Sequence, residues 1–427
     1  MKKKLRIAIN AQIPSGSGAG GIETVLRFMT SLNRLEGDEE YVFIGHHSDS
    51  DWLEQLLGER QTLVRAPQPE AERKTNQTEN LKRLMGPLRP LARHLKRLVT
   101  KPFEANISVS TSEGFFENLN CDVVHFPYQD YVRCRVPTVF NPHDLQHLHY
   151  PDFFSADEVK KREAIYPAAC RAADIVVVAS QFVKRDVSRR YGIDTGKIQV
   201  IPWSPPPIKL KEFTEKDVKS IFDKYECPPR PYILYPAMTW EHKNHVRLLE
   251  AVALLREREG LKVNVICTGH KNSFYAHIEQ RLRELDLAEQ VRFTGIVERE
   301  ELSLFYRQAQ FVIVPTLFEA ASAPLFEAWQ HDVAVACSSV TSLPEQAADA
   351  ALLFDAFSVE EIANAIKRMA RDEALREELR HRGFKRLKTF DLRRTAKAYR
   401  AVYRKLGGVV LSDEERELLN WDWMRDP

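Results

Sequence analysis

The sequence predicts an α/β fold with two Rossmann-like domains in tandem. Short apolar runs rich in Val and Ile alternate with amphipathic segments of helix length, a pattern typical of parallel sheets covered by helices on both faces. The chain has 427 residues, which is too long for one hydrophobic core and fits two domains of roughly 200 residues. Trp203-Ser204-Pro205-Pro206-Pro207 divides the pattern in two, because successive prolines cannot continue a helix or a central strand.

The elements follow from the same periodicity in chain order. In the first half we predict helices over residues 22–35 and 181–191 and strands over residues 5–10, 41–45, 122–126, 138–141, 175–179 and 198–202. In the second half we predict a helix over residues 246–257 and strands over residues 232–236, 262–268, 291–294, 311–315 and 333–338. From Val359 onward the pattern is helical and includes a capping-box sequence from Ser412 to Glu415. The predicted domains are 1–203 and 204–390, followed by C-terminal helices over 391–427 that we expect to pack back toward the first domain.

Composition narrows the class of protein. Sixty-two Lys and Arg against 60 Asp and Glu give a formal charge of +2, so no global field favours nucleic acid as a partner. The six cysteines are scattered without a C-x-x-C pair, which favours a reducing cytoplasm and gives no reason to expect a metal. The apolar run after the N-terminal lysines is interrupted by Arg6 and is too short for a signal peptide. No run of ~18 apolar residues predicts a membrane span, so we expect a cytoplasmic protein, at most peripheral at the inner face of the plasma membrane.

A glycine-rich loop lies between the first predicted strand and helix. Residues 16–21 match G-x-G-x-x-G, which is compatible with a dinucleotide-binding oxidoreductase. The next predicted strand, however, is followed by His46 and His47 rather than by the acid that binds an NAD ribose. A flexible glycine-rich loop without a specific role is an equally good interpretation. A loop that opens the following helix can also approach an anion through its backbone N–H groups.

Two glutamates follow the predicted strand 311–315. Pro324 suits the first position of a helix, so Glu319 is expected in the loop and Glu327 in the first helical turn. Carboxylates at the carboxyl end of a parallel strand can accept hydrogen bonds from sugar or ribose hydroxyls, and the helix start can hold an anion. The alternative is a pair of solvated glutamates on a surface turn.

Lys243 occupies a comparable place after the predicted strand 232–236. An ammonium there can stabilise the charge of a departing pyrophosphate. Taken alone, a lysine in such a position is more often an ordinary exposed lysine.

Together these segments resemble the retaining glycosyltransferases of family four, which have the GT-B fold. The resemblance covers nearly the whole chain. It is carried by Gly20-Gly21, His143-Asp144-Leu145, residues 175–180, His242-Lys243-Asn244, Phe293-Thr294-Gly295, the Glu319 and Glu327 pair, and Ser342-Leu343-Pro344-Glu345.

The resemblance implies two domains facing across a cleft, with the acceptor bound mainly by the first and a nucleotide-sugar donor mainly by the second. It implies that Glu319 contacts sugar hydroxyls, that Lys243 contacts phosphate, and that His143 lies near the transferred sugar. It implies ribose contact by Glu327 and a backbone position near the base at Gly295, with no metal or other cofactor. The remaining substrate-binding positions expected on this basis are Gly20, Gly21, Thr239, Ala320, Ala321, Ser322 and Ala323.

Two departures from the family pattern stand in the second half. Ala320-Ala321-Ser322 replaces the usual Gly-Phe-Gly, which leaves less backbone freedom beside the donor. Thr239 and Trp240 stand near the place of an arginine that the family commonly has. The missing arginine removes one phosphate contact, whereas Ala320-Ala321-Ser322 suggests, as an alternative, a catalytically weakened GT-B scaffold that binds nucleotide or glycan without turnover.

Residues 73–101 bear on the acceptor. They contain nine Lys or Arg and one Glu, with leucines near helical spacing. Such a stretch can lie on an anionic membrane and bring the enzyme to a lipid-linked acceptor, or it can be a core-packed helix with a solvated basic face.

The leading hypothesis is a retaining hexosyltransferase, of the mannose or glucose type, in cell-surface polysaccharide or glycolipid synthesis.

Overall fold

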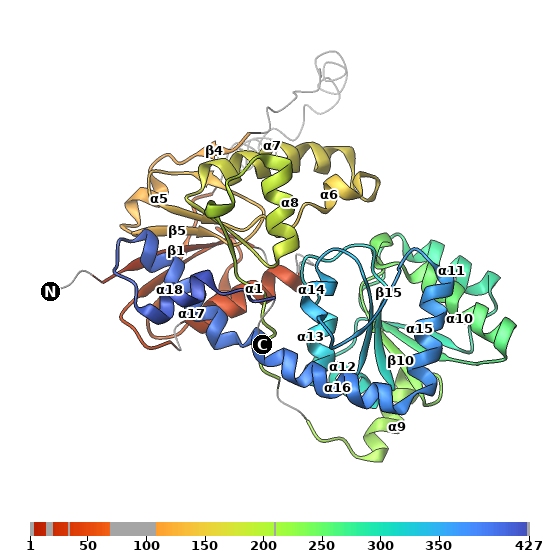
Figure 1. Ribbon diagram of the computed structural model, residues 1–427. Helices are drawn as coiled ribbons and strands as arrows, with labels where there is room; N and C mark the ends of the chain where they lie inside the picture. Colours follow the sequence, from red (N-terminus) through yellow and green to blue (C-terminus); the bar gives the residue numbers. More distant parts are fainter. Residues whose placement is uncertain (1–3, 14–19, 33–34, 69–107, 209–210, 425–427) are drawn as a thin grey trace, which may run out of the picture. The chain divides into compact units, whose positions relative to one another are not determined.

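The computed structural model describes residues 4–13, 20–32, 35–68, 108–208 and 211–424 (Figure 1). Contacts divide the chain into two compact units. The first comprises Met1–Pro142, Lys160–Val176 and Tyr403–Val410, and the second comprises His143–Val159, Val177–Val402 and Leu411–Pro427. The loop 14–19 and the basic stretch 73–101 lie outside the described residues, so the interpretations that rest on them stay predictions. The predicted domain boundaries also stay predictions.

The first sheet has the strand order β3-β2-β1-β5-β7-β8-β9, and its paired strands from β3 to β8 run parallel. Its strands are β1 (Arg6–Ala11), β2 (Glu40–Gly45), β3 (Gln61–Arg65), β5 (Val123–Phe126), β7 (Thr138–Phe140), β8 (Ile175–Val178) and β9 (Ile198–Val200). A short pair, β4 (Ser110–Thr111) and β6 (Val132–Arg133), forms a separate sheet. All six predicted strands of the first half are present. Edge strand β3 was not predicted, because Gln61-Thr62-Leu63-Val64-Arg65 has too few apolar residues to stand out.

The helical segments that accompany the first sheet are short except for three. They are α1 (Gly20–Ser31), α2 (Asp51–Glu54), α5 (Phe115–Asn118), α6 (Gln146–His149), η3 (Pro151–Phe153), α7 (Ala156–Ala172), α8 (Gln181–Tyr191) and η4 (Thr195–Lys197). Helix α8 matches its predicted range, because Ser180 accepts from the Val183 N–H at its start and Gly192 ends it at φ 66°.

A buried polar chain belongs to the core of the first unit. His125, on β5, contacts the Tyr403 hydroxyl through Nδ1 at 2.8 Å and Asn141 Oδ1 through Nε2 at 2.9 Å. Tyr403 lies in the C-terminal helix α17 (Leu392–Leu406). Part of this late helix is therefore fixed in the unit that the first strands build.

The second sheet is parallel, with the strand order β12-β11-β10-β13-β14-β15. Its strands are β10 (Tyr232–Pro236), β11 (Asn264–Thr268), β12 (Val291–Gly295), β13 (Phe311–Val314), β14 (Val335–Ser338) and β15 (Leu352–Phe354). The five strands predicted here are confirmed. The short edge strand β15 was not predicted, since three residues carry no readable periodicity.

Helices cover both faces of the second sheet (Figure 1), with α10, α11 and α15 on one face and α12 and α13 on the other. The helices of this half are α9 (Glu215–Lys224), α10 (His245–Glu259), α11 (Tyr275–Glu284), α12 (Arg299–Gln308), α13 (Ala323–Gln330), α14 (Leu343–Ala347), α15 (Val359–Arg371) and α16 (Glu373–Leu387), with the 3-10 turns η5 (Glu241–Lys243) and η6 (Lys388–Phe390). Ile233, Val265 and Ile313 of the strands are fully buried in one core cluster with Leu249 of α10 and Ile366 of α15. This packing holds the strand ends in fixed positions.

The last described helix is α18 (Asp413–Asn420), whose predicted capping box is confirmed. The Ser412 hydroxyl accepts from the Glu415 N–H, and the Glu415 carboxylate accepts from the Ser412 N–H. Within the described ranges, no helix is both long and apolar enough to span a bilayer.

Candidate functional site

The centre of the second sheet is a topological switch point. Strands β10 and β13 are neighbours there; the chain continues outward through β11 and β12 on one side and through β14 and β15 on the other. Loops that leave two such strands diverge at the carboxyl edge, which is where open α/β sheets bind ligands. Lys243 follows β10 and Glu319 follows β13.

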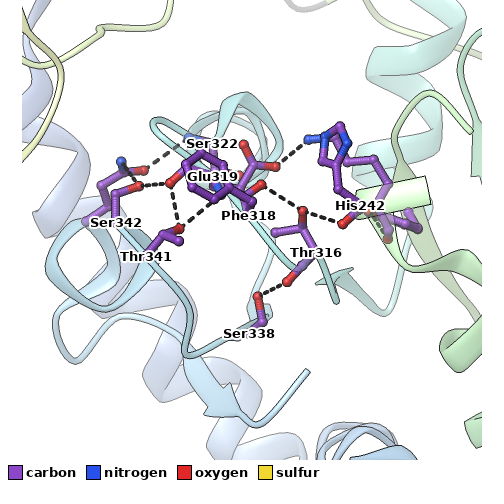
Figure 2. A network of polar contacts seen from close by, with 11 residues as sticks. His242, Thr316, Phe318, Glu319, Ser322, Ser338, Thr341 and Ser342 are labelled. Carbon is purple, nitrogen blue, oxygen red and sulfur yellow. Dashed lines mark hydrogen bonds and ion pairs between the residues drawn. The ribbon is translucent and has the colours of Figure 1, made fainter. Parts of the chain in front are cut away.

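Lys243 and Glu319 form an ion pair at this point (Figure 2). Lys243 Nζ donates to Glu319 Oε1 at 2.5 Å, and the two side chains are 19% and 9% exposed. The alternative of solvated surface residues is therefore wrong for Glu319. Two residues that are 76 positions apart in the sequence meet because parallel strands end at the same edge of the sheet.

The turn that carries Lys243 is held by hydrogen bonds from the surrounding core. The Tyr235 hydroxyl donates to the Lys243 carbonyl at 2.7 Å. Asn244 adopts the left-handed conformation at φ 62°, and its side-chain amide donates to the carbonyls of Pro315 and Ala356, both at 2.9 Å. Asparagine tolerates this conformation better than most residues, so it can fix the turn and start α10. Tyr235 and Asn244 position Lys243, and sequence reasoning did not find this role.

The loop that carries Glu319 is clamped by residues that follow β14. The hydroxyls of Thr341 and Ser342 both donate to the Glu319 carbonyl at 2.7 Å, and the Glu319 N–H donates to Thr341 Oγ1 at 2.9 Å (Figure 2). Gln346 accepts from the Ser322 N–H and donates to the Ala320 carbonyl. These side chains fix the backbone from Glu319 to Ser322. In the sequence, the Ser342–Glu345 segment stood out only through the family resemblance.

The alanines of this loop are not strained. Neither Ala320, Ala321 nor Ser322 is among the described residues with positive φ. The glycine freedom that the family pattern provides is therefore not needed for the conformation seen here. Ser322 is fully buried at the N-cap position of α13, and Ala323 is the first helical residue.

Burial governs the charge of Glu319. Desolvation raises the pKa of the Glu319 carboxyl above its ordinary value, while the adjacent Lys243 ammonium lowers it through charge and hydrogen bonding; Asp144, in the same unit, raises it slightly. The pair is thus a partly desolvated cation and anion, whose electrostatic interaction is stronger than it would be in water.

Glu327 makes contacts of its own, separate from those of this pair. Helix α13 begins at Ala323, with Pro324 second, so Glu327 lies in the second turn and the predicted first-turn position is wrong by one residue. Its carboxylate accepts from the Tyr306 hydroxyl at 2.7 Å, and burial raises its pKa. It lines a hollow of about 330 Å³ together with residues of α12 and with Pro206, Pro207, Ile208 and Lys211. No described hydrogen bond or ion pair joins Glu327 to Lys243 or Glu319.

The loops after β10, β11 and β12 are tied together. Thr239 is buried; its hydroxyl donates to Asn272 Oδ1 and accepts from the Asn272 N–H, both at 2.9 Å. Gly269 donates from its N–H to the Gly295 carbonyl at 2.8 Å, and both glycines have positive φ, at 121° and 78°. The Thr239 hydroxyl is thus engaged in structure, whereas a Cβ at Gly295 would have no heavy atom within 4 Å. Sequence reasoning missed Gly269, although a glycine directly after a strand was a usable signal.

His143 follows β7 and takes a left-handed conformation at φ 64°. The neighbouring Asp144 accepts from the Gln146 N–H at 2.9 Å, as expected of a capped turn. Gly20 and Gly21 open α1. Their predicted roles, like those of all the candidate site residues, stay predictions.

Two histidines beside Lys243 are uncharged. Burial, followed by the Lys243 charge, lowers the pKa of His245 to about 3, and the same causes together with His245 lower the pKa of His242 to about 2. His245 is fully buried against the rings of Tyr235 and Phe293, and neither ring nitrogen has a hydrogen-bond partner among the described residues.

Acid is expected to destabilise the protein through His245. The unfolded imidazole takes up a proton below its ordinary pKa of 6.5, whereas folded His245 stays neutral down to about pH 3. Its contribution is therefore complete above pH 6.5 and is lost as the pH falls, by about 2 kcal/mol at pH 5. The His245→Phe variant keeps a ring between Tyr235 and Phe293 but has no group that titrates there. Between pH 7 and pH 5, we expect its free energy of unfolding to fall by about 2 kcal/mol less than that of the wild type. Urea unfolding at the two pH values measures this, and parallel pH profiles would contradict it.

Among the described residues, no group of three or more His, Cys, Asp and Glu is arranged to hold a metal ion. The expectation of catalysis without a metal stays a prediction.

Comparisons with known proteins cover most of the chain. The family model described as glycosyl transferases group 1 matches residues 217–386, and the Glycosyltransferase Family 4 model matches residues 20–203. The O-antigen chain mannosyltransferase B of Escherichia coli is 26% identical over 269 residues, which are 60% of this chain and 66% of that protein. The O-antigen chain mannosyltransferase RfbU of Salmonella typhimurium is 24% identical over 225 residues, 53% of this chain and 58% of that protein. The matched part thus spans less than two thirds of the length of either relative.

Solved structures agree on the fold. A glycosyltransferase from Rickettsia africae aligns with a TM-score of 0.63 at 14% identity, covering 95% of this chain and 99% of that one. Anabaena HepE, solved in complex with UDP and glucose, aligns with a TM-score of 0.64 at 15% identity, covering 94% and 100%. The predicted GT-B class, with two Rossmann-like sheets and a helical C-terminal segment, is confirmed.

Proposed function

The chain belongs to the glycosyl transferases group 1, and from that membership we propose that it transfers a hexose from a nucleotide-sugar to a glycan or lipid-linked acceptor. We propose mannose as the sugar and cell-surface polysaccharide or glycolipid as the product class. Two relatives named as O-antigen chain mannosyltransferases support this choice. The solved complex of HepE with UDP and glucose supports a nucleotide-sugar as the donor.

The observation that carries the proposal is the ion pair of Lys243 and Glu319 at the switch point of the second sheet. An ammonium held at the carboxyl edge can stabilise the negative charge that grows on a departing diphosphate. The carboxylate beside it accepts hydrogen bonds from sugar hydroxyls and orients the ring. The amides at the start of α13 add partial positive charge next to the same loop.

In the proposed reaction, the bond between the sugar anomeric carbon and the phosphate oxygen breaks, and a bond from an acceptor hydroxyl oxygen to that carbon forms. The hydroxyl proton leaves to the departing phosphate. We propose that attack occurs on the face the phosphate leaves, so that the anomeric configuration is retained. The protein supplies orientation and charge stabilisation rather than a covalent nucleophile.

A donor screen tests the proposal. GDP-mannose, UDP-glucose and UDP-galactose are incubated with the protein and octyl α-D-mannopyranoside, and the released nucleotide and glycosylated product are measured. We expect turnover with GDP-mannose, and proton NMR of the product should show an α linkage, as in the donor. Nucleotide binding without release of nucleotide from any donor would instead favour the non-catalytic scaffold.

A further inference from the structure

Trp240 is the only exposed tryptophan among the described residues, with 46% of its surface in contact with solvent. It immediately precedes η5, the turn that carries Lys243. One exposed apolar side chain on a protein surface is ordinary. Trp240 differs from such a residue in two ways: hydrogen bonds hold the backbone on both sides of it, and it lies at the carboxyl edge of the second sheet.

The backbone on both sides of Trp240 is held in position. On one side, Thr239 donates its N–H to the His270 carbonyl at 3.1 Å and exchanges two hydrogen bonds with Asn272. On the other side, the Trp240 carbonyl accepts from the Lys243 N–H at 2.9 Å. The indole is therefore presented from a fixed turn, so little conformational entropy is lost when a ligand packs on it.

Other exposed large apolar residues lie at the same edge. Ile296 follows β12 and Phe357 follows β15, and both are more than half exposed. Because all strands of this sheet are parallel, Trp240, Ile296 and Phe357 all lie in loops at its carboxyl edge. The edge that holds the ion pair therefore also carries apolar surface that no described side chain covers fully.

Burial separates the residues of this edge into an inner and an outer set. Lys243 and Glu319 are the inner set, at 19% and 9% exposure, and are suited to the donor diphosphate and sugar. Trp240 and Glu241 are exposed on the same turn and form the outer set. An acceptor hydroxyl has to reach a sugar held by the inner set from the solvent side, where the outer set lies.

From this gradient we propose, on the basis of the function proposed above, that Trp240 binds the acceptor by packing against a pyranose ring. The C–H face of a pyranose is apolar and slightly positive, and it complements the negative face of an indole. Glu241, beside it, offers carboxylate oxygens that accept from ring hydroxyls. The Glu241 carboxylate repels an anion, so this pair of an aromatic face and a carboxylate fits a neutral sugar rather than a phosphate; a nucleobase stacked on Trp240 would instead raise the donor KM of the variant described below.

The test separates the two substrates. KM is measured for octyl α-D-mannopyranoside at saturating GDP-mannose, and for GDP-mannose at saturating acceptor, in the wild type, Trp240→Ala and Trp240→Phe. We expect Trp240→Ala to raise the acceptor KM at least tenfold while the donor KM stays within twofold. Trp240→Phe, which keeps an aromatic face, should raise the acceptor KM less than threefold.

Phe384 provides the matched control. It is 55% exposed and belongs to helix α16 rather than to a loop that follows a strand of the second sheet, so Phe384→Ala should leave both KM values unchanged. An acceptor KM for Trp240→Ala within twofold of the wild type, or an equal rise in Phe384→Ala, overturns this inference and leaves the proposed function standing. Absence of turnover in the wild type with every donor overturns the proposed function and the inference with it.

Discussion

Replacing Lys243 with methionine is expected to lower kcat/KM for sugar transfer by about 10²- to 10³-fold. The ammonium lies at the switch point of the second sheet, in a partly desolvated setting where a fixed charge stabilises a developing anion more than in water. Methionine keeps the length and the apolar stem of lysine but removes the charge. Initial rates of nucleotide release at varied donor concentrations give the value.

This substitution also affects stability, and a second variant separates the two effects. Without Lys243, the Glu319 carboxylate is left buried and unpaired, which costs about 3 kcal/mol. The double variant Lys243→Met, Glu319→Gln removes both charges, so its stability should return toward that of the wild type while turnover stays lost.

The control pair is Lys367 and Glu259, which lie 2.8 Å apart in the same unit. Lys367→Met should retain wild-type turnover. If the double variant regains turnover together with stability, Lys243 has a structural role and the electrostatic account is wrong.

Replacing Gly269 with alanine is expected to lower the free energy of unfolding of the second unit by about 3 kcal/mol. Gly269 has φ 121°, a region that side chains rarely adopt, so strain alone costs about 1–3 kcal/mol. A Cβ at this position would also lie 2.8 Å from the Ala237 carbonyl carbon and oxygen and 2.9 Å from the Met238 nitrogen. These are backbone atoms of the loop after β10 and cannot move aside as a flexible side chain would. Urea unfolding followed by circular dichroism measures the loss.

Gly260 is the matched control for this experiment. It also has positive φ, at 63°, but a Cβ there would meet nothing within 4 Å. Gly260→Ala should therefore cost only about 1 kcal/mol, from the left-handed conformation itself. Equal losses in the two variants would show that the contact with the Ala237 loop contributes nothing.

Much of the fold could be predicted from the sequence because its central strands are buried on both faces. Runs such as Ile175–Val178 and Phe311–Val314 are continuously apolar, and such runs stand out against amphipathic helices. In the two main sheets, the strands that were missed are β3 and β15, which lie at sheet edges, where partial exposure permits polar residues and short lengths.

The candidate site was only partly predictable. Lys243 and Glu319 could be found because each lies in the loop after a strand that its apolar residues identify. Parallel strands bring such loops to one edge of the sheet. The supporting residues could not be found in this way. Gln346 acts through a side chain that reaches back across 24 residues to Ser322, and Tyr235 acts from within a strand where its ring reads simply as core. Hydrogen bonds of this kind depend on the three-dimensional packing and leave no periodic signal.

The central position of β10 and β13 has a consequence for how this chain can diversify. Insertions or deletions after the outer strands β12 and β15 alter the margins of the sheet without changing the spacing of the two middle strands. The peripheral loops can therefore change in length and sequence while Lys243 and Glu319 keep their geometry. Grafting those outer loops from a relative would therefore change the margins of the sheet and leave the Lys243–Glu319 ion pair in place.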